Sequence, residues 1–206
     1  MSLRMLARMA ECLVSGLCVG ACTIAPGPAG GVDGSLVRVL PPPGFGTLRQ
    51  EDVSIQLTSR ELQIMLTPLH ESVTRVTAPD TERRLSGLAA AHPTGGGQAA
   101  LFLVSFFSAQ PDVRFVPEEV QLISRGMRVR PATITPITPT WGQRRVQQRQ
   151  TEMAVYAFAG EIDLESELVF AYGLDQTRQW SVILPRIQAE RARARARAGV
   201  GGEVTP

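Results

Sequence analysis

The sequence contains few side chains of the types that carry out acid–base or nucleophilic chemistry. Its two histidines, His70 and His92, lie 22 positions apart in segments where a strand or helix is expected to end. All three cysteines fall within the first 22 residues, so a metal site elsewhere would have to combine distant histidines with carboxylates. The sequence has neither a phosphate-binding loop with its lysine nor a Gly-x-Ser-x-Gly turn. We therefore predict that the protein is not an enzyme and holds no metal ion or cofactor.

One acidic cluster has the spacing to collect a cation or a basic partner. Glu161, Asp163, Glu165 and Glu167 alternate along the chain, and a strand would place all four carboxylates on one face. Carboxylate oxygens arranged in this way could bind Ca²⁺ or a basic protein surface. The alternative, which we prefer, is the solvent-exposed face of an edge strand whose other face carries the intervening isoleucine and leucine.

The cysteines belong to a segment with the features of an export signal. Arg4 and Arg8 precede an apolar stretch that begins at Cys12 and ends in small residues just before Cys22. Even when it is extended to Ala25, the apolar run has fourteen residues, fewer than the roughly 17 that a membrane-spanning helix needs.

Residues 1–22, which end in the sequence Val-Gly-Ala-Cys, resemble the lipobox signal of bacterial lipoproteins. In that family a Leu, a small or branched residue and a Gly or Ala precede the cysteine that is lipidated. The resemblance implies that residues 1–21 are a signal peptide and that the mature chain begins with a lipidated Cys22. Its acyl chains, at about 0.8 kcal/mol per buried CH₂, would hold the protein on the membrane. The alternatives are an ordinary secretory signal and a short buried helix in a cytoplasmic protein.

The next segment, residues 22–46, is expected to be a tether. Residues 23–46 contain six glycines and five prolines, and few long apolar side chains. Such a segment buries too little apolar surface to offset the entropy lost on ordering, although a short strand over 35–40 is compatible with its sequence.

The body of the chain, residues 47–188, is predicted to be a mainly β, antiparallel sandwich of immunoglobulin-like architecture. Apolar residues alternate over 52–58 and 62–66, as in half-buried strands, whereas 100–108 is almost wholly apolar and should be a central strand buried on both faces. Arg125-Gly126 has the composition of a hairpin turn. The remaining strands are expected over 120–124, 127–130, 152–159, 168–172 and 180–184.

Two helices are expected beside these strands. One should cross an end of the sandwich over about 78–91, with a capping box formed by Thr77 and Asp80 and with its leucines sealing that end. The other should cover about 185–198, where a proline in the first turn is followed by alanines and arginines, both good helix formers.

Two segments offer possible contacts to a partner. The three prolines of 131–140 exclude a central strand and favour an extended excursion, so the tryptophan that follows is either exposed for a partner or packed on its own core. The arginines of the basic extension, residues 189–206, would spread around a helix and could contact anionic head groups or an acidic protein. The alternative is that they are exposed to solvent without a partner and reflect only the codon bias of the genome. The candidate partner contacts are therefore Trp141, Arg191, Arg193, Arg195 and Arg197.

The amino-acid composition indicates the type of genome and argues against nucleic-acid binding. All 21 basic residues are arginine, and the chain has no lysine or asparagine, which indicates a GC-rich bacterial genome and leaves sharp turns to Gly, Asp and Pro. The net charge of +2 is too small to indicate nucleic-acid binding.

Together these features predict a lipid-anchored, extracytoplasmic, non-catalytic accessory or interaction subunit of a bacterial envelope complex. It would lie on the periplasmic side of the inner or outer membrane, attached through Cys22, with a protein partner. The alternative is a periplasmic carrier or chaperone that binds an apolar ligand such as a lipid. A large apolar pocket would favour the carrier, and a filled sandwich core would favour the interaction subunit.

Overall fold

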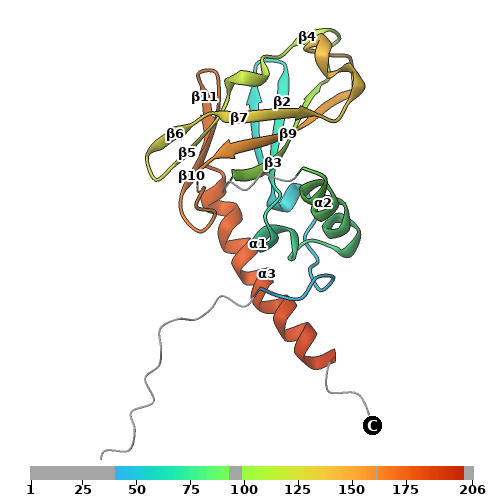
Figure 1. Ribbon diagram of the computed structural model, residues 1–206, viewed down its shortest axis with the longest axis vertical. Coiled ribbons are helices and arrows are strands. Elements are labelled where there is room, and N and C mark those ends of the chain that lie inside the picture. The colour runs from blue at the N-terminus through green and yellow to red at the C-terminus, as the bar shows by residue number, and fades with distance from the viewer. Residues whose placement is uncertain (1–39, 93–98, 161, 202–206) are drawn as a thin grey trace, which may run out of the picture. The chain divides into compact units, whose positions relative to one another are not determined.

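The computed structural model describes residues 40–92, 99–160 and 162–201. The predicted signal peptide, most of the predicted tether and Glu161 lie outside these residues. In the described part, two antiparallel sheets pack together, and the α-helices lie toward one end of them (Figure 1). The prediction of a mainly β, antiparallel sandwich is confirmed.

The larger sheet has five strands in the order β1-β2-β3-β9-β7, and all neighbouring pairs are antiparallel. The central strand, β3, sends Phe102 and Phe106 into the core between the sheets and Leu103 to the opposite face. The expectation that 100–108 forms a central strand buried on both faces is confirmed. The strands are β1 (Ile55–Ser59), β2 (Leu62–Pro68), β3 (Ala99–Ser108), β7 (Pro131–Pro136) and β9 (Thr151–Ala159).

The smaller sheet has four strands in the order β11-β10-β5-β6. They are β5 (Val120–Ser124), β6 (Met127–Val129), β10 (Leu168–Tyr172) and β11 (Asp175–Thr177). The predicted turn between β5 and β6 is present, with Arg125 at φ 51° and Gly126 at φ 76°. The shorter elements are β4 (Val113–Arg114), which pairs with β8 (Arg145–Val146), and the 3₁₀ helices η1 (Glu51–Val53), η2 (Pro117–Glu119) and η3 (Pro139–Gln143).

Arginine occupies four of the five non-glycine positions with positive φ in the described residues. The non-glycine residues with positive φ are Arg60, Asp112, Arg125, Arg144 and Arg149. The expectation that sharp turns fall to Gly, Asp and Pro is therefore wrong at four of these positions. Asparagine, which tolerates this conformation better than most residues, is absent from the chain. Each arginine held there costs roughly 1–2 kcal/mol of backbone strain.

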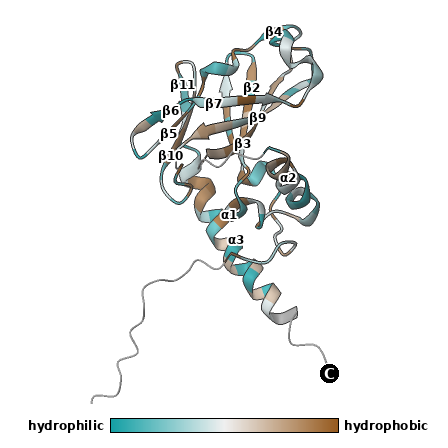
Figure 2. Cartoon of the chain, viewed as in Figure 1, coloured by the Kyte–Doolittle hydropathy of each residue, from teal (hydrophilic) through white to brown (hydrophobic). Residues whose placement is uncertain are grey.

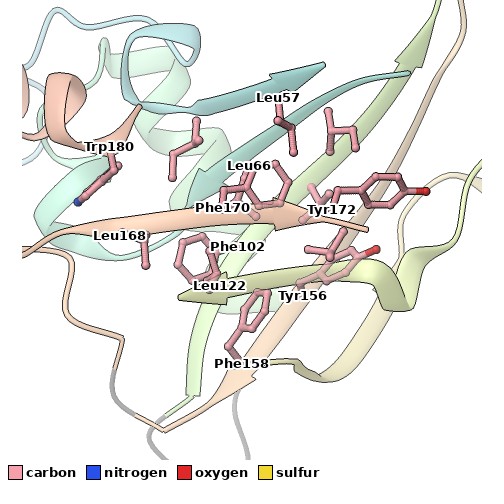
Figure 3. Close-up of a cluster of buried hydrophobic side chains, with 14 of the residues drawn as sticks. Leu57, Leu66, Phe102, Leu122, Tyr156, Phe158, Leu168, Phe170, Tyr172 and Trp180 are labelled. Carbon is pink, nitrogen blue, oxygen red and sulfur yellow. The ribbon is translucent and has the colours of Figure 1, made fainter. Parts of the chain in front are cut away.

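The core between the sheets is filled by large side chains. Phe102 and Phe158 meet edge to face with ring centroids 5.4 Å apart, and Phe106 stacks on Phe115 at 4.6 Å. Figure 3 shows side chains of the larger sheet, Phe102 and Phe158 among them, meeting those of the smaller sheet. The buried phenol of Tyr156 donates to a carbonyl of η2 at 3.1 Å, and burial raises its pKa, so the hydroxyl keeps its proton.

The segment 131–140 is an edge strand followed by a 3₁₀ helix. Its first part, β7, pairs with β9 at the edge of the larger sheet, with an irregularity between Pro131 and Thr133. The prolines therefore exclude a central strand, as expected, but they do not prevent pairing, because an edge strand needs its N–H groups on only one side.

The helix α2 (Pro79–Ala91) corresponds to the helix predicted over 78–91, but it packs elsewhere. Leu85 is fully buried and packs with Leu103 and Val155 against the outer face of the larger sheet, whereas the prediction had it sealing the core between the sheets at one end of the sandwich. β3 supplies Leu101 and Leu103 to this face and β9 supplies Val155, so the face needs a cover of its own.

The predicted capping box at the start of α2 does not form. Ala78 holds the N-cap position without a side-chain hydrogen bond. The hydroxyl of Thr77 instead donates to the Thr74 carbonyl at 2.7 Å, because a short helix, α1 (Glu71–Thr74), ends just before it. No separate sequence pattern predicted this short helix.

The C-terminal helix α3 (Trp180–Gly201) is longer than predicted. The expected strand over 180–184 is wrong, because these residues form the first turns of the helix. Trp180, Ile183 and Ile187 are buried at helical spacing, and Pro185 lies inside the helix and not at its start. Figure 2 shows a hydrophobic beginning of α3 and a mixed, largely hydrophilic continuation.

Candidate functional site

The chain enters the folded domain along α3. We call residues 40–48 the entry segment. Leu48 pairs with the turn between α1 and α2, since its N–H donates to Val76 O at 3.1 Å and its carbonyl accepts from Ala78 N at 2.8 Å. Gly46 lies so close to this turn that a Cβ would stand 2.1 Å from the Val76 carbonyl carbon. Residues 46–48 therefore pack against this turn of the domain.

A buried carboxylate on α3 binds this entry segment. The side chain of Glu190 is 2% exposed and accepts a hydrogen bond from the Thr47 hydroxyl at 2.8 Å. It also accepts one from Arg197 and lies 3.6 Å from Arg193. Burial opposes ionisation of Glu190, but the hydrogen bonds from Thr47 and Arg197 outweigh it and hold the pKa of the carboxyl below its usual value.

Arg197 connects Glu190 to the entry segment a second time. Its Nε and Nη2 donate to the carbonyl of Phe45 at 3.0 and 2.6 Å. Thr47 and Phe45 are thus both tied to α3, at positions seven residues apart on the helix. We call this set of contacts the junction: Phe45, Thr47, Glu190 and Arg197.

Arg191, the residue after Glu190, attaches another side of α3 to the domain. Its side chain is 8% exposed, Nε donates to Ser72 O at 2.9 Å, and Nη1 donates to Glu165 at 2.6 Å. Arg191 therefore joins α3 to α1 and to the loop before β10. The guanidinium groups of Arg191 and Arg197, two of the predicted partner contacts, are both bound inside the domain.

Arg193 and Arg195 keep the exposure that a partner contact requires. The side chain of Arg193 is 68% exposed. Arg195 is exposed, and its Nε donates to the Arg191 carbonyl at 3.3 Å. The predicted basic extension therefore belongs to α3 over residues 189–201, and two of its arginines face solvent.

Trp141 is buried in the core. It is 6% exposed and lies 4.9 Å from Phe115 and 5.8 Å from Phe106 between ring centroids. Of the two alternatives for Trp141, a partner contact and packing on its own core, the structure supports packing.

The acidic cluster is dispersed over a loop. Residues 162–167 form a turn and no strand, so the carboxylates do not share one face. Asp163 pairs with Arg125 at 2.8 Å, Glu165 with Arg191, and Glu167 with Arg178 at 3.2 Å. The hydrogen bond from Arg125 lowers the pKa of Asp163. Within the described residues, no group of three or more histidine, cysteine or acidic side chains is placed to hold a metal ion.

The two histidines cap helix ends. His70 precedes α1, and its Nδ1 accepts from Ser72 N at 3.2 Å. His92 follows α2, and its Nδ1 lies 2.8 Å from the Leu88 carbonyl. Because a carbonyl only accepts, that nitrogen of His92 carries the proton.

Two surface hollows lie toward opposite ends of the sandwich. The basal cleft combines adjoining hollows of about 400 and 550 Å³, which share the apolar side chains Leu40, Ala100, Ile162 and Leu164 together with His70. The distal cleft, of about 830 Å³, is lined by the β1–β2 turn, β4 and the β10–β11 turn, and includes Arg114 and the fully exposed Leu174.

The sequence alone did not indicate the junction. In the sequence, Glu190 and Arg191 belong to an arginine-rich segment that was expected to be exposed to solvent. Their hydrogen-bond partners lie far away in the chain: Thr47 is 143 positions from Glu190, and Ser72 is 119 positions from Arg191. The available signal was the helical spacing of Trp180, Ile183 and Ile187, which continues through the buried Ala194.

The described residues therefore define an antiparallel β-sandwich whose entry segment is bound to a C-terminal helix. None of its described helices is both long enough and apolar enough to cross a bilayer. No protein-family model matches the chain, and no curated protein matches it in sequence.

Two solved structures show similarity to the chain. One is a secreted protein from Mycobacterium tuberculosis, MPT63, at 9% identity, with 64% of this chain and 93% of that chain covered and a TM-score of 0.35. The other is a functionally unknown protein from Listeria monocytogenes EGD-e, at 12% identity, with 61% and 74% covered and a TM-score of 0.32.

Proposed function

We propose that this protein is a lipid-anchored, extracytoplasmic, non-catalytic interaction subunit of a bacterial envelope complex, attached to the membrane through Cys22. The observation that carries the proposal is the junction. It binds the last residues of the glycine- and proline-rich segment that follows Cys22 to α3, through Phe45 and Thr47. Such a connection suits a domain that is held at a surface by its N-terminus.

The junction gives the domain a defined polarity. The entry segment and the last turns of α3 lie toward one end, and β4 lies at the other end (Figure 1). A domain held by its entry segment would present the distal cleft away from the membrane. Leu174, fully exposed at the rim of this cleft, is a suitable anchor for a protein partner, because apolar side chains at the centre of an interface contribute most when they are buried by the partner.

A carrier of an apolar ligand is the second candidate, and the basal cleft favours it. Its shared lining is mostly aliphatic, from Leu40 to Leu164, and its volume matches that of a small-molecule site. The core between the sheets is filled by aromatic side chains, so a ligand would have to bind in this basal cleft. We rank the interaction subunit first for that reason.

The test is co-purification of the native protein from membranes in mild detergent, read by mass spectrometry. We expect a stable partner protein to be recovered with the unmodified chain and lost with Leu174→Asp. Met127→Asp, at the exposed first residue of β6, is the matched control and should retain the partner. Recovery of the unmodified chain as a free monomer, or equal recovery of the partner with Leu174→Asp, would contradict the proposal. Recovery of a stoichiometric lipid in place of a protein would favour the carrier.

A further inference from the structure

The last turns of α3 carry an excess of positive charge. Residues 186–201 contain five arginines and a single acidic residue, Glu190. Because Glu190 is buried and bound at the junction, it offers no negative charge to the surface. The charged groups that the last turns of α3 present to solvent are therefore all positive.

Internal contacts account for only some of these arginines. Arg191 holds α1, and Arg197 holds the carbonyl of Phe45. Arg193 makes a long contact of 3.6 Å with Glu190 and stays 68% exposed, and Arg195 contacts a backbone carbonyl of its own helix. We call Arg193 and Arg195 the basic end of α3.

We infer that the basic end of α3 binds the anionic phospholipid head groups of the membrane that carries the lipid anchor. The inference rests on the proposed function, and it assigns to the same end of the domain a second, electrostatic contact. Guanidinium groups and phosphate groups form strong, charge-assisted hydrogen bonds, and a basic helix is attracted to an anionic bilayer surface.

The position of the entry segment supports a membrane as the occupant. The anchor site Cys22 and the first described residue, Leu40, are separated by 17 residues, which span up to about 50 Å at about 3.1 Å per residue. The chain then reaches Phe45, whose carbonyl is bound to Arg197 and whose side chain is 38% exposed. An aromatic side chain beside arginines at the end of a tether is well placed for the head-group region.

The arrangement of the arginines favours a lipid surface over an acidic protein. Successive helical residues are 100° apart, so Arg193 and Arg195 point to nearly opposite sides of α3. A specific protein contact would need the charges on one face, whereas a fluid layer of head groups can surround the end of a helix. The tether would also keep the arginines of α3 close to the membrane, so that a weak attraction is enough for them to bind head groups.

The test uses vesicles and an unlipidated protein. Residues 38–206 form one compact unit, so the processed chain from residue 22 with Cys22→Ser is a suitable background. We expect it to sediment with vesicles of equal parts phosphatidylglycerol and phosphatidylcholine, and not with phosphatidylcholine alone. Each arginine near an anionic surface contributes about fivefold to the binding constant, so Arg193→Gln with Arg195→Gln should weaken binding by about 25-fold.

The matched control removes the same charge elsewhere. Arg114→Gln with Arg130→Gln replaces two exposed arginines on the sandwich and should leave vesicle binding unchanged. Equal binding by the α3 variant and this control, equal binding to both kinds of vesicle, or binding to an acidic protein without binding to vesicles would overturn the inference. Lipidation of Cys22 is measured separately on the native chain, so loss of the head-group contact and loss of the anchor give different results.

Discussion

The buried carboxylate of Glu190 accepts a hydrogen bond from Arg197, and the same guanidinium donates to the carbonyl of Phe45. One side chain therefore satisfies both a buried charge on α3 and a backbone group of the entry segment. The end of the predicted tether and the end of the last helix are joined by this relationship, so a perturbation of either should be felt by the other.

Replacement of Arg197 should destabilise the domain more than replacement of its exposed neighbour. Arg197→Met leaves the buried Glu190 with one hydrogen bond fewer and removes two from Phe45 O, so we expect the free energy of unfolding to fall by about 1–3 kcal/mol. Arg195→Met removes an exposed arginine that has no carboxylate partner among the described residues, and it should change the free energy of unfolding by less than about 0.5 kcal/mol. Urea unfolding measures both. Equal effects of the two variants would show that the junction contributes no stability.

The contribution of Glu190 should depend on pH in a predictable direction. Its pKa is held below the usual value of 4.5, so ionised Glu190 stabilises the fold above that pH, and this stabilisation is lost as the pH falls through the lowered pKa. The unmodified chain should therefore be more stable than Glu190→Gln at about pH 7, and the difference should shrink toward about pH 3. Other acidic groups, such as Asp163, titrate in both proteins and cancel. A difference that is constant over this range would contradict the assignment.

The close approach of the entry segment to the α1–α2 turn depends on a glycine. In Gly46→Ala the new Cβ would meet the Val76 carbonyl carbon at 2.1 Å, so the segment would have to move, at a cost of about 1–3 kcal/mol or more. Gly87→Ala, in α2 with open space around it, should instead stabilise the domain by about 0.5–1 kcal/mol. Thermal unfolding distinguishes the two. A Gly46→Ala protein as stable as the unmodified chain would show that residues 40–46 are not packed on the domain.

The sheets followed from the sequence more readily than the junction did. The alternation of apolar and other residues over 62–66 and the apolar run over 100–108 predicted which residues are buried, because strand faces repeat every two residues. The run over 180–184 is too short to separate a buried strand from a buried helix, and only the longer spacing through Ile187 decides for the helix.

Burial of charged side chains could not be predicted in the same way. Arg197 and Glu165 compensate the buried charges of Glu190 and Arg191, and Thr47 and Ser72, far away in the sequence, complete their hydrogen bonds. Local pattern carries no information about such partners. Trp141 shows the same limit, since its surroundings in the core come from three separate elements, β3, β9 and the segment at Phe115.

The left-handed arginines offer a direct route to a more stable domain. Arg149 is exposed and has a φ of 59°, so Arg149→Gly should relieve backbone strain and raise the free energy of unfolding by about 0.5–1 kcal/mol. Arg130→Gly, at an exposed position without positive φ, should lower it by a similar amount. Urea unfolding of the two variants checks the prediction, which fails if both are destabilised equally.

The central claim is that the chain is held on a membrane by a lipid at Cys22. The most direct measurement is the mass of the N-terminal peptide of the protein purified from its native membrane. The account predicts a peptide that begins at Cys22 and carries a diacylglyceryl group on sulfur and an acyl chain on the amino group. A peptide that begins elsewhere, or one that contains Cys22 with a free thiol, would contradict it.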